Sequence, residues 1–85
     1  MKTVYRLYTE DRTNLESLIG RYFKGVTLLS GVGLWEGHSE PCAVIEVIGD
    51  KDLLQVMMFL AGDIKEKNSQ SSVLVTWHEV SMMEI

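Results

Sequence analysis

The side chains most suited to chemistry in this sequence include a histidine and a carboxylate, His78 and Glu46. A histidine beside a carboxylate on a half-buried sheet can act as a general acid or base near neutral pH. We expect Arg6 and Tyr8 to lie on the same sheet face. The competing interpretation is that Arg6 and Glu46 form an ion pair across neighbouring strands. His78 and Glu46 are therefore catalytic candidates only, because no motif requires an enzyme.

A second group of titratable residues follows the spacing Glu36, His38 and Glu40, with His78 and Glu79 later in the chain. Two histidines and a carboxylate would suit a transition metal. We expect the hairpin that carries His38 to lie at the same end of the sheet as His78. The spacing matches no established metal motif, so a solvated loop is the favoured interpretation. We predict no metal and no cofactor.

Charge and composition argue against several other kinds of site. Eight basic and twelve acidic residues give a net charge of −4, which disfavours binding to phosphate backbones. The strand expected over residues 42–48 lacks the aromatic residues on which RNA-binding sheets stack bases. Gly31 and Gly33 are not followed by the third glycine and the helix of a dinucleotide-binding loop. We therefore predict no nucleic-acid partner.

Apolar runs and cysteine content bear on location. The longest apolar runs, such as residues 56–61, are too short to span a bilayer, and the N-terminus lacks the apolar core of a secretory signal. The single cysteine, Cys42, cannot form an internal disulfide, and a fold without disulfides suits a reducing compartment. We expect a cytoplasmic protein without membrane contact, with Cys42 as a small buried hydrophobic residue.

The chain that must position these residues contains four candidate strands. They are rich in β-branched, aromatic or other apolar residues and are expected over residues 3–9, 26–35, 42–48 and 72–80. The third is almost entirely apolar, which is typical of a central strand. Residues 36–41, which include the only proline, are expected to form a connecting loop.

Two helices are expected between the strands. The first carries an apolar stripe from Leu15 to Phe23, begins at a capping box formed by Thr13 and Glu16, and ends at Gly25 in a left-handed cap. The second runs from about residue 51 to residue 67, with Asp50 as its N-cap. Its core stripe is expected to contain Leu53, Met57, Leu60, Ala61 and Ile64.

The resulting order of elements predicts one domain of 85 residues, an α+β two-layer sandwich of the split βαβ or ferredoxin-like kind. Right-handed crossovers then give an antiparallel sheet in the order 4-1-3-2 with both helices on one face. Alternation along each strand divides the side chains between the two faces. Those expected to face the helices are Tyr5, Leu7, Ala43, Ile45, Val47, Val73, Val75 and Trp77. Those expected on the other face are Arg6, Tyr8, Val44, Glu46, Leu74, Thr76 and His78.

Apolar residues exceed what this core needs. The second helix carries Leu54, Val56, Met58 and Phe59 outside its core stripe, and the chain ends in an apolar tail. Exposed apolar patches usually mark contact sites, and methionine adapts well to interfaces. The residues expected in contacts between chains are Val56, Phe59, Leu74, Val44, Met82 and Met83.

These features favour a small non-enzymatic interaction or regulatory domain that works as a homodimer or higher homo-oligomer, with a further protein partner also compatible. One alternative is a small enzyme of the dimeric α+β-barrel kind that uses His78. Another is an acidic inhibitor, of the kind that phages and mobile elements encode, bound to a basic face of a host protein.

Three short motifs resemble a pattern of an uncharacterised family of short bacterial α+β proteins. They occupy residues 4–8 (VYRLY), 33–37 (GLWEG) and 70–74 (QSSVL). The family pattern reads R-L-Y-F, G-Q-W-R and Q-E-S-V-L, from which this chain departs at Leu34, Glu36 and Ser71 and in a shorter first helical region. The resemblance implies the ferredoxin-like fold and no particular activity. The layout also looks like that of PII-type signalling proteins, without their long ligand-gripping loop.

Overall fold

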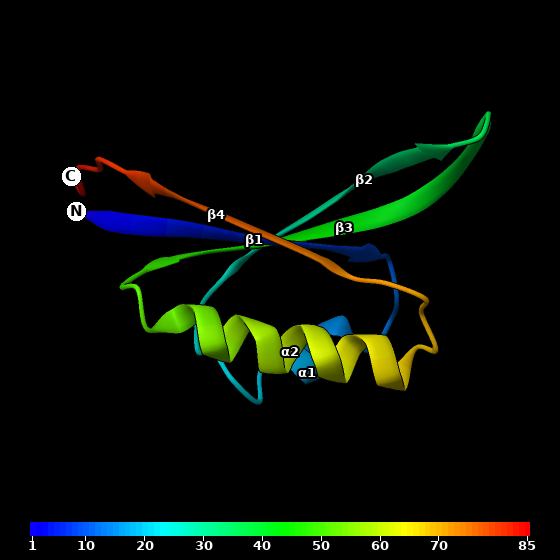
Figure 1. Cartoon of the computed structure of the whole chain (residues 1–85), viewed down its shortest axis with the longest axis horizontal. Coiled ribbons are helices and arrows are strands. Elements are labelled where there is room, and N and C mark those ends of the chain that lie inside the picture. Colours follow the sequence, from blue (N-terminus) through cyan, green and yellow to red (C-terminus); the bar gives the residue numbers. More distant parts are fainter.

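The computed structural model describes residues 1–85 as a four-stranded antiparallel sheet with both helices on one face (Figure 1). The elements, in chain order, are β1 (Lys2–Glu10), α1 (Leu15–Ile19), β2 (Thr27–Trp35), β3 (His38–Gly49), α2 (Leu53–Lys67) and β4 (Leu74–Val80). The sheet order is β2-β3-β1-β4. This is the predicted order 4-1-3-2 counted from the opposite edge.

Strand register divides the side chains between two faces as the sequence predicts. In the centre of the sheet Tyr5 lies opposite Val47 on one side and Trp77 on the other, while Arg6 lies opposite Glu46 and Thr76. The first set faces the helices and the second faces away from them. The core lies between sheet and helices and consists of Tyr5, Leu7, Leu15, Leu18, Ile19, Ala43, Ile45, Val47, Met57, Leu60 and Ile64.

The expected loop over residues 36–41 is instead a tight turn followed by strand. Only Glu36 and Gly37 connect β2 to β3, and both have positive φ, 48° and 81°, as a two-residue hairpin turn of the I′ type requires. β3 therefore begins at His38, four residues before its predicted start. Beyond Cys42, which lies opposite Glu10, the hairpin continues past the end of β1 as a projecting arm (Figure 1).

The first helix is shorter than predicted. α1 ends at Ile19, and the chain continues through turns in which Arg21 and Tyr22 donate backbone hydrogen bonds to residues three positions earlier. Gly20 follows the last helical residue, and glycine is a poor helix former. The N-cap is Asn14 rather than Thr13, without a side-chain cap hydrogen bond, and Gly25 does not have the positive φ of a left-handed cap.

The predicted cap of the second helix is also wrong. α2 begins at Leu53 with Asp52 at the N-cap position, and no side chain caps its first turn. The Asp50 carboxylate instead accepts a hydrogen bond from Lys2 Nζ at 3.0 Å, and the Asp50 carbonyl accepts one from the Tyr5 hydroxyl at 2.6 Å. Asp50 therefore connects β1 to the β3–α2 turn. The predicted core stripe of α2 is confirmed by its buried residues Met57, Leu60 and Ile64.

Candidate functional site

The structure does not bring the two catalytic candidates together. The Glu46 carboxylate accepts a hydrogen bond from Arg6 Nε at 2.8 Å, which is the cross-strand ion pair considered as the alternative interpretation. This hydrogen bond raises the pKa of Arg6 above its ordinary value. His78 lies in a different cross-strand row, opposite Val4, and its exposed side chain makes no hydrogen bond within the chain. Glu46 is therefore occupied by Arg6, and His78 has no carboxylate partner.

The metal hypothesis relied on an arrangement that is wrong. His38 begins β3 beyond the end of β1, whereas His78 lies near the end of β4, opposite the start of β1. The two histidines thus occupy opposite ends of the sheet, because β3 and β4 both run antiparallel to β1. No group of three His, Cys, Asp or Glu side chains is placed to hold a metal ion.

The sheet face without helices, here called the open face, carries an apolar row with one residue from each strand. Leu29, Val44, Tyr8 and Leu74 are successive cross-strand partners. Leu29 and Leu74, at the two ends of this apolar row, are 51% and 59% exposed. Cys42 lies on the same face and is partly exposed, not buried as expected. The row is thus an apolar band across the whole width of the sheet and is most exposed at its two ends, whereas Val4, farther along the same face, is buried.

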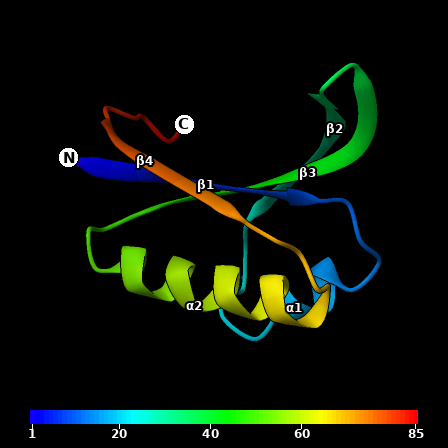
Figure 2. The ribbon, with the colours of Figure 1, turned by 45° about the vertical axis from the view of Figure 1, so that its right-hand side comes forward.

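Two projecting parts of the chain flank the open face. At one end the β2–β3 arm bends away from the helices, and at the other end the C-terminal tail turns back on the same side (Figure 2). The tail carries the exposed side chains of Met82 and Met83. Tyr8 and Leu74 border a hollow of about 250 Å³ at the base of the arm. The open face therefore has a projecting segment at each of its two ends.

The second surface expected to bind another chain lies on α2. Phe59 and Met58 are 57% and 60% exposed, while Val56 is partly buried. The aliphatic residues Leu54 and Leu53 pack against the core from the start of the same helix. Exposed apolar surface on α2 is thus confined to a few side chains along one side of the helix.

Trp77 faces the helices as predicted, but it is not part of the buried core. It shares the helix-side face with its partner Tyr5, yet its side chain is 55% exposed, because β4 is an edge strand and α2 leaves a cleft beside it. This cleft, of about 390 Å³, separates β4 from the start of α2. Its lining consists of Thr3, Tyr5, Lys51, Leu54, Trp77, His78 and Glu79.

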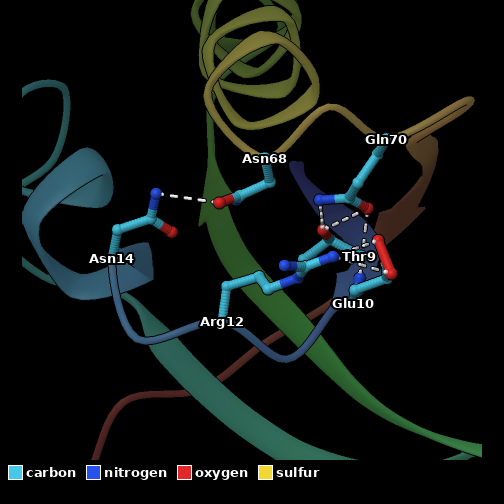
Figure 3. Close-up of polar contacts among 6 residues, drawn as sticks. All are labelled: Thr9, Glu10, Arg12, Asn14, Asn68 and Gln70. Carbon is cyan, nitrogen blue, oxygen red and sulfur yellow. Dashed lines mark hydrogen bonds and ion pairs between the residues drawn. The ribbon is translucent and has the colours of Figure 1, made fainter.

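A buried polar cluster that the sequence did not predict joins the end of β1 to the α2–β4 turn (Figure 3). The Gln70 amide contacts the Thr9 hydroxyl through its oxygen at 3.0 Å and its nitrogen at 2.8 Å, and its oxygen also accepts from the Glu10 amide at 3.3 Å. Nearby, Asn14 donates to Asn68 at 2.9 Å. These contacts hold the end of β1 and the start of α1 against the α2–β4 turn, while Asn14 Oδ1 and Asn68 Nδ2 are buried without a hydrogen-bond partner. Polar residues in a predicted turn gave no signal that they would be buried.

Comparison with known proteins assigns no family. No protein-family model matches this sequence, and no curated protein matches it. In the structure itself, no helix has the length and apolar character needed to cross a membrane.

Proposed function

We propose that this chain is a non-enzymatic interaction domain that works as a homo-oligomer, with the open face of its sheet packed against a second copy. The order of elements and of strands supports assignment to the ferredoxin-like group of folds. In this proposal the arrangement of two helices on one face leaves the other face free for assembly.

The observation that carries the proposal is an excess of exposed surface. The single chain exposes 6146 Å², whereas a compact monomer of 9.6 kDa is expected to expose about 5,100 Å². The difference, about 1,000 Å², is close to the roughly 800 Å² that each partner buries in a standard interface. The radius of gyration, 13.2 Å, also exceeds the roughly 12 Å expected for a domain of this length. Packing against a second copy would bury the surface that the chain cannot bury in its own small core.

The chemistry of the open face suits burial against another sheet. The apolar row supplies a desolvated centre, which is where binding energy concentrates in protein interfaces. Arg6 and Glu46 beside the row already neutralise one another at 2.8 Å, so covering them would not leave either charge unpaired. α2 has no comparable continuous band, and we therefore place the interface on the sheet.

A second copy is the occupant that this face fits best. The open face carries the apolar row and, beside it, the Arg6–Glu46 pair whose charges cancel, although the whole chain has a net charge of −4, so two copies can meet there without bringing unpaired charges together. Two identical faces related by a twofold axis form a closed, self-complementary interface. Antiparallel sheets also pack face to face readily, as in β-sandwiches.

Sedimentation velocity at micromolar protein concentration tests this proposal. The wild-type chain is expected to sediment with twice the 9.6 kDa mass of one chain. Leu74→Lys places a charge in the apolar row and is expected to give monomers. Leu34→Lys is the matched control, since Leu34 is 79% exposed on the arm and lies outside that row.

Three outcomes would contradict the proposal. A monomeric wild-type chain would remove the homo-oligomer. Equal dissociation by Leu74→Lys and Leu34→Lys would mean that the apolar row has no special role, because a lysine outside the row has the same effect as one within it. Dissociation by Phe59→Lys, with Leu74→Lys still dimeric, would move the interface to α2.

A further inference from the structure

The cleft beside Trp77 has a floor and two walls that come from different elements. Thr3 and Tyr5 of β1 form the floor, because both face the helices. Trp77 and Glu79 of β4 form one wall, since they are the cross-strand partners of Tyr5 and Thr3. The opposite wall is formed by the β3–α2 turn and the first turn of α2. The volume of the cleft, about 390 Å³, lies within the usual range of small-molecule sites, about 300–1,000 Å³.

Three polar side chains of this cleft have no partner within the chain. Thr3 is 6% exposed, and its hydroxyl makes no hydrogen bond. Lys51 and Glu79, from opposite walls, carry opposite charges, yet neither belongs to an ion pair, unlike Lys2 and Arg6 nearby. The Thr3 hydroxyl is not sealed from solvent, and Lys51 and Glu79 are exposed, so all three polar groups are free to contact a ligand in the cleft.

The lining of the cleft also has an apolar part. Trp77 and Leu54 belong to opposite walls, and the half-exposed indole of Trp77 is the largest side chain that lines the cleft. The Tyr5 hydroxyl is already engaged with the Asp50 carbonyl at 2.6 Å, which fixes the floor and leaves Tyr5 to contribute its ring. The cleft therefore combines an apolar slot with separated positive and negative groups.

We propose that this cleft binds a free α-amino acid with an apolar side chain. The ligand carboxylate accepts hydrogen bonds from the Lys51 ammonium and the Thr3 hydroxyl, its ammonium group faces the Glu79 carboxylate, and its side chain lies between Trp77 and Leu54. A zwitterion satisfies both charges of the cleft, whereas a simple anion would leave Glu79 facing it and a simple amine would leave Lys51 unpaired. The site uses the helix-side face and is independent of the proposed interface on the open face.

Fluorescence titration with L-leucine tests this proposal. The chain has two tryptophans, so Trp35→Phe, which changes a residue of the distant arm, leaves Trp77 as the only reporter. We expect a saturable change in Trp77 emission with a Kd of about 1 mM or lower. Isoamylamine lacks the carboxylate and 4-methylpentanoate lacks the ammonium group, and each is expected to bind at least about tenfold more weakly.

Variants in the same background identify the contacts. Lys51→Ala and Glu79→Gln are each expected to weaken leucine binding about tenfold or more, the effect of losing a charged contact. Lys65→Ala and Glu66→Gln, on the surface of α2 outside the cleft, are the matched controls and should leave the affinity unchanged. The proposal is wrong if no apolar amino acid gives a saturable change. It is also wrong if the amine or the acid binds as tightly as leucine, or if the Lys51 and Glu79 variants bind like their controls.

Discussion

At the scale of single residues, buried hydrogen bonds connect the ends of secondary-structure elements. Gln70 is buried and serves both the Thr9 hydroxyl and the Glu10 amide at the end of β1 (Figure 3). Gln70→Ala leaves these two groups unpaired, so we expect the free energy of unfolding to fall by about 1–3 kcal/mol. Urea unfolding measures it. Gln55→Ala, on the exposed side of α2, is the control and should change stability by less than about 0.5 kcal/mol. Equal effects would contradict the role of Gln70.

Tyr22 makes a second hydrogen bond of this kind, and its contribution to stability depends on pH. Its hydroxyl donates to the Asp63 carboxylate on α2, and this hydrogen bond, followed by burial, raises the pKa of Tyr22 above its ordinary value of 10.0. The folded state therefore holds the proton more tightly than the unfolded state. The contribution to stability is complete below pH 10 and is lost as the pH rises from there through the raised pKa.

Urea unfolding at a series of pH values on both sides of 10 checks this expectation. The wild-type chain should lose stability more steeply above that pH than Tyr22→Phe, which lacks the titrating hydroxyl. Parallel curves for the two proteins would show that the Tyr22–Asp63 contact does not contribute.

Residues that could be assigned from sequence are those whose neighbours are fixed by periodicity. The Arg6–Glu46 pair follows from alternation in two adjacent strands, and the structure confirms it at 2.8 Å. The Gln70–Thr9 contact joins positions 61 residues apart in sequence through a turn, where no periodicity applies. The predicted capping role of Asp50 is wrong for the same reason, because its partners are Lys2 and Tyr5, which are distant in sequence.

At the scale of elements, the junction of β3 and α2 leaves little room for a side chain at Gly49. A Cβ atom on Gly49 would lie 2.2 Å from Leu53 Cδ1, so Gly49→Ala forces the Leu53 side chain to move at the start of α2. Because the end of the Leu53 side chain can rotate away, we expect a loss of about 1 kcal/mol in unfolding free energy, the lower end of the range typical of overpacking. Gly62→Ala is the matched control. Gly62 lies within α2 with open space around it, and alanine should add about 0.5–1 kcal/mol there. Thermal or urea unfolding that shows the same sign for both variants would contradict this description.

Strands and the long helix were predictable because their hydrophobic patterns repeat over many residues. The β2–β3 arm was not, because Pro41 and the polar residues from His38 to Glu40 are typical of a loop. Strand is possible there because Pro41 lies beyond the last residue of β3 that pairs with β1, so β3 is unpaired on that side and a missing N–H costs little. The end of α1 was missed because Tyr22 and Phe23 continue the helical spacing while packing against the core from turns.

At the scale of the whole molecule, sheet order and the covered face could be inferred from sequence, whereas the exposed area could not. The arm and the tail extend from a core of eleven residues, and the chain measures 38 × 26 × 20 Å (Figure 2). A sequence does not show how far a hairpin extends beyond its neighbours. The surplus surface and the apolar row support our proposal that the open face is an interface between two copies.

The native Cys42 allows the most direct test of that claim. It is the only cysteine, it is partly exposed, and it lies on the open face opposite Gly31 and Glu10. A nitroxide on Cys42 places one spin label on each chain. Sheets packed face to face lie about 10 Å apart, so two copies would bring their labels close enough for strong dipolar coupling. Sedimentation of the labelled chain is the control, since its mass should equal that of the unlabelled chain.

Pulsed electron paramagnetic resonance then measures the distance between the labels. We expect one short distance in the wild-type protein, its retention in Leu34→Lys and its loss in Leu74→Lys. Absence of dipolar coupling in a labelled chain that sediments as a dimer, or coupling that survives Leu74→Lys, would contradict the proposal.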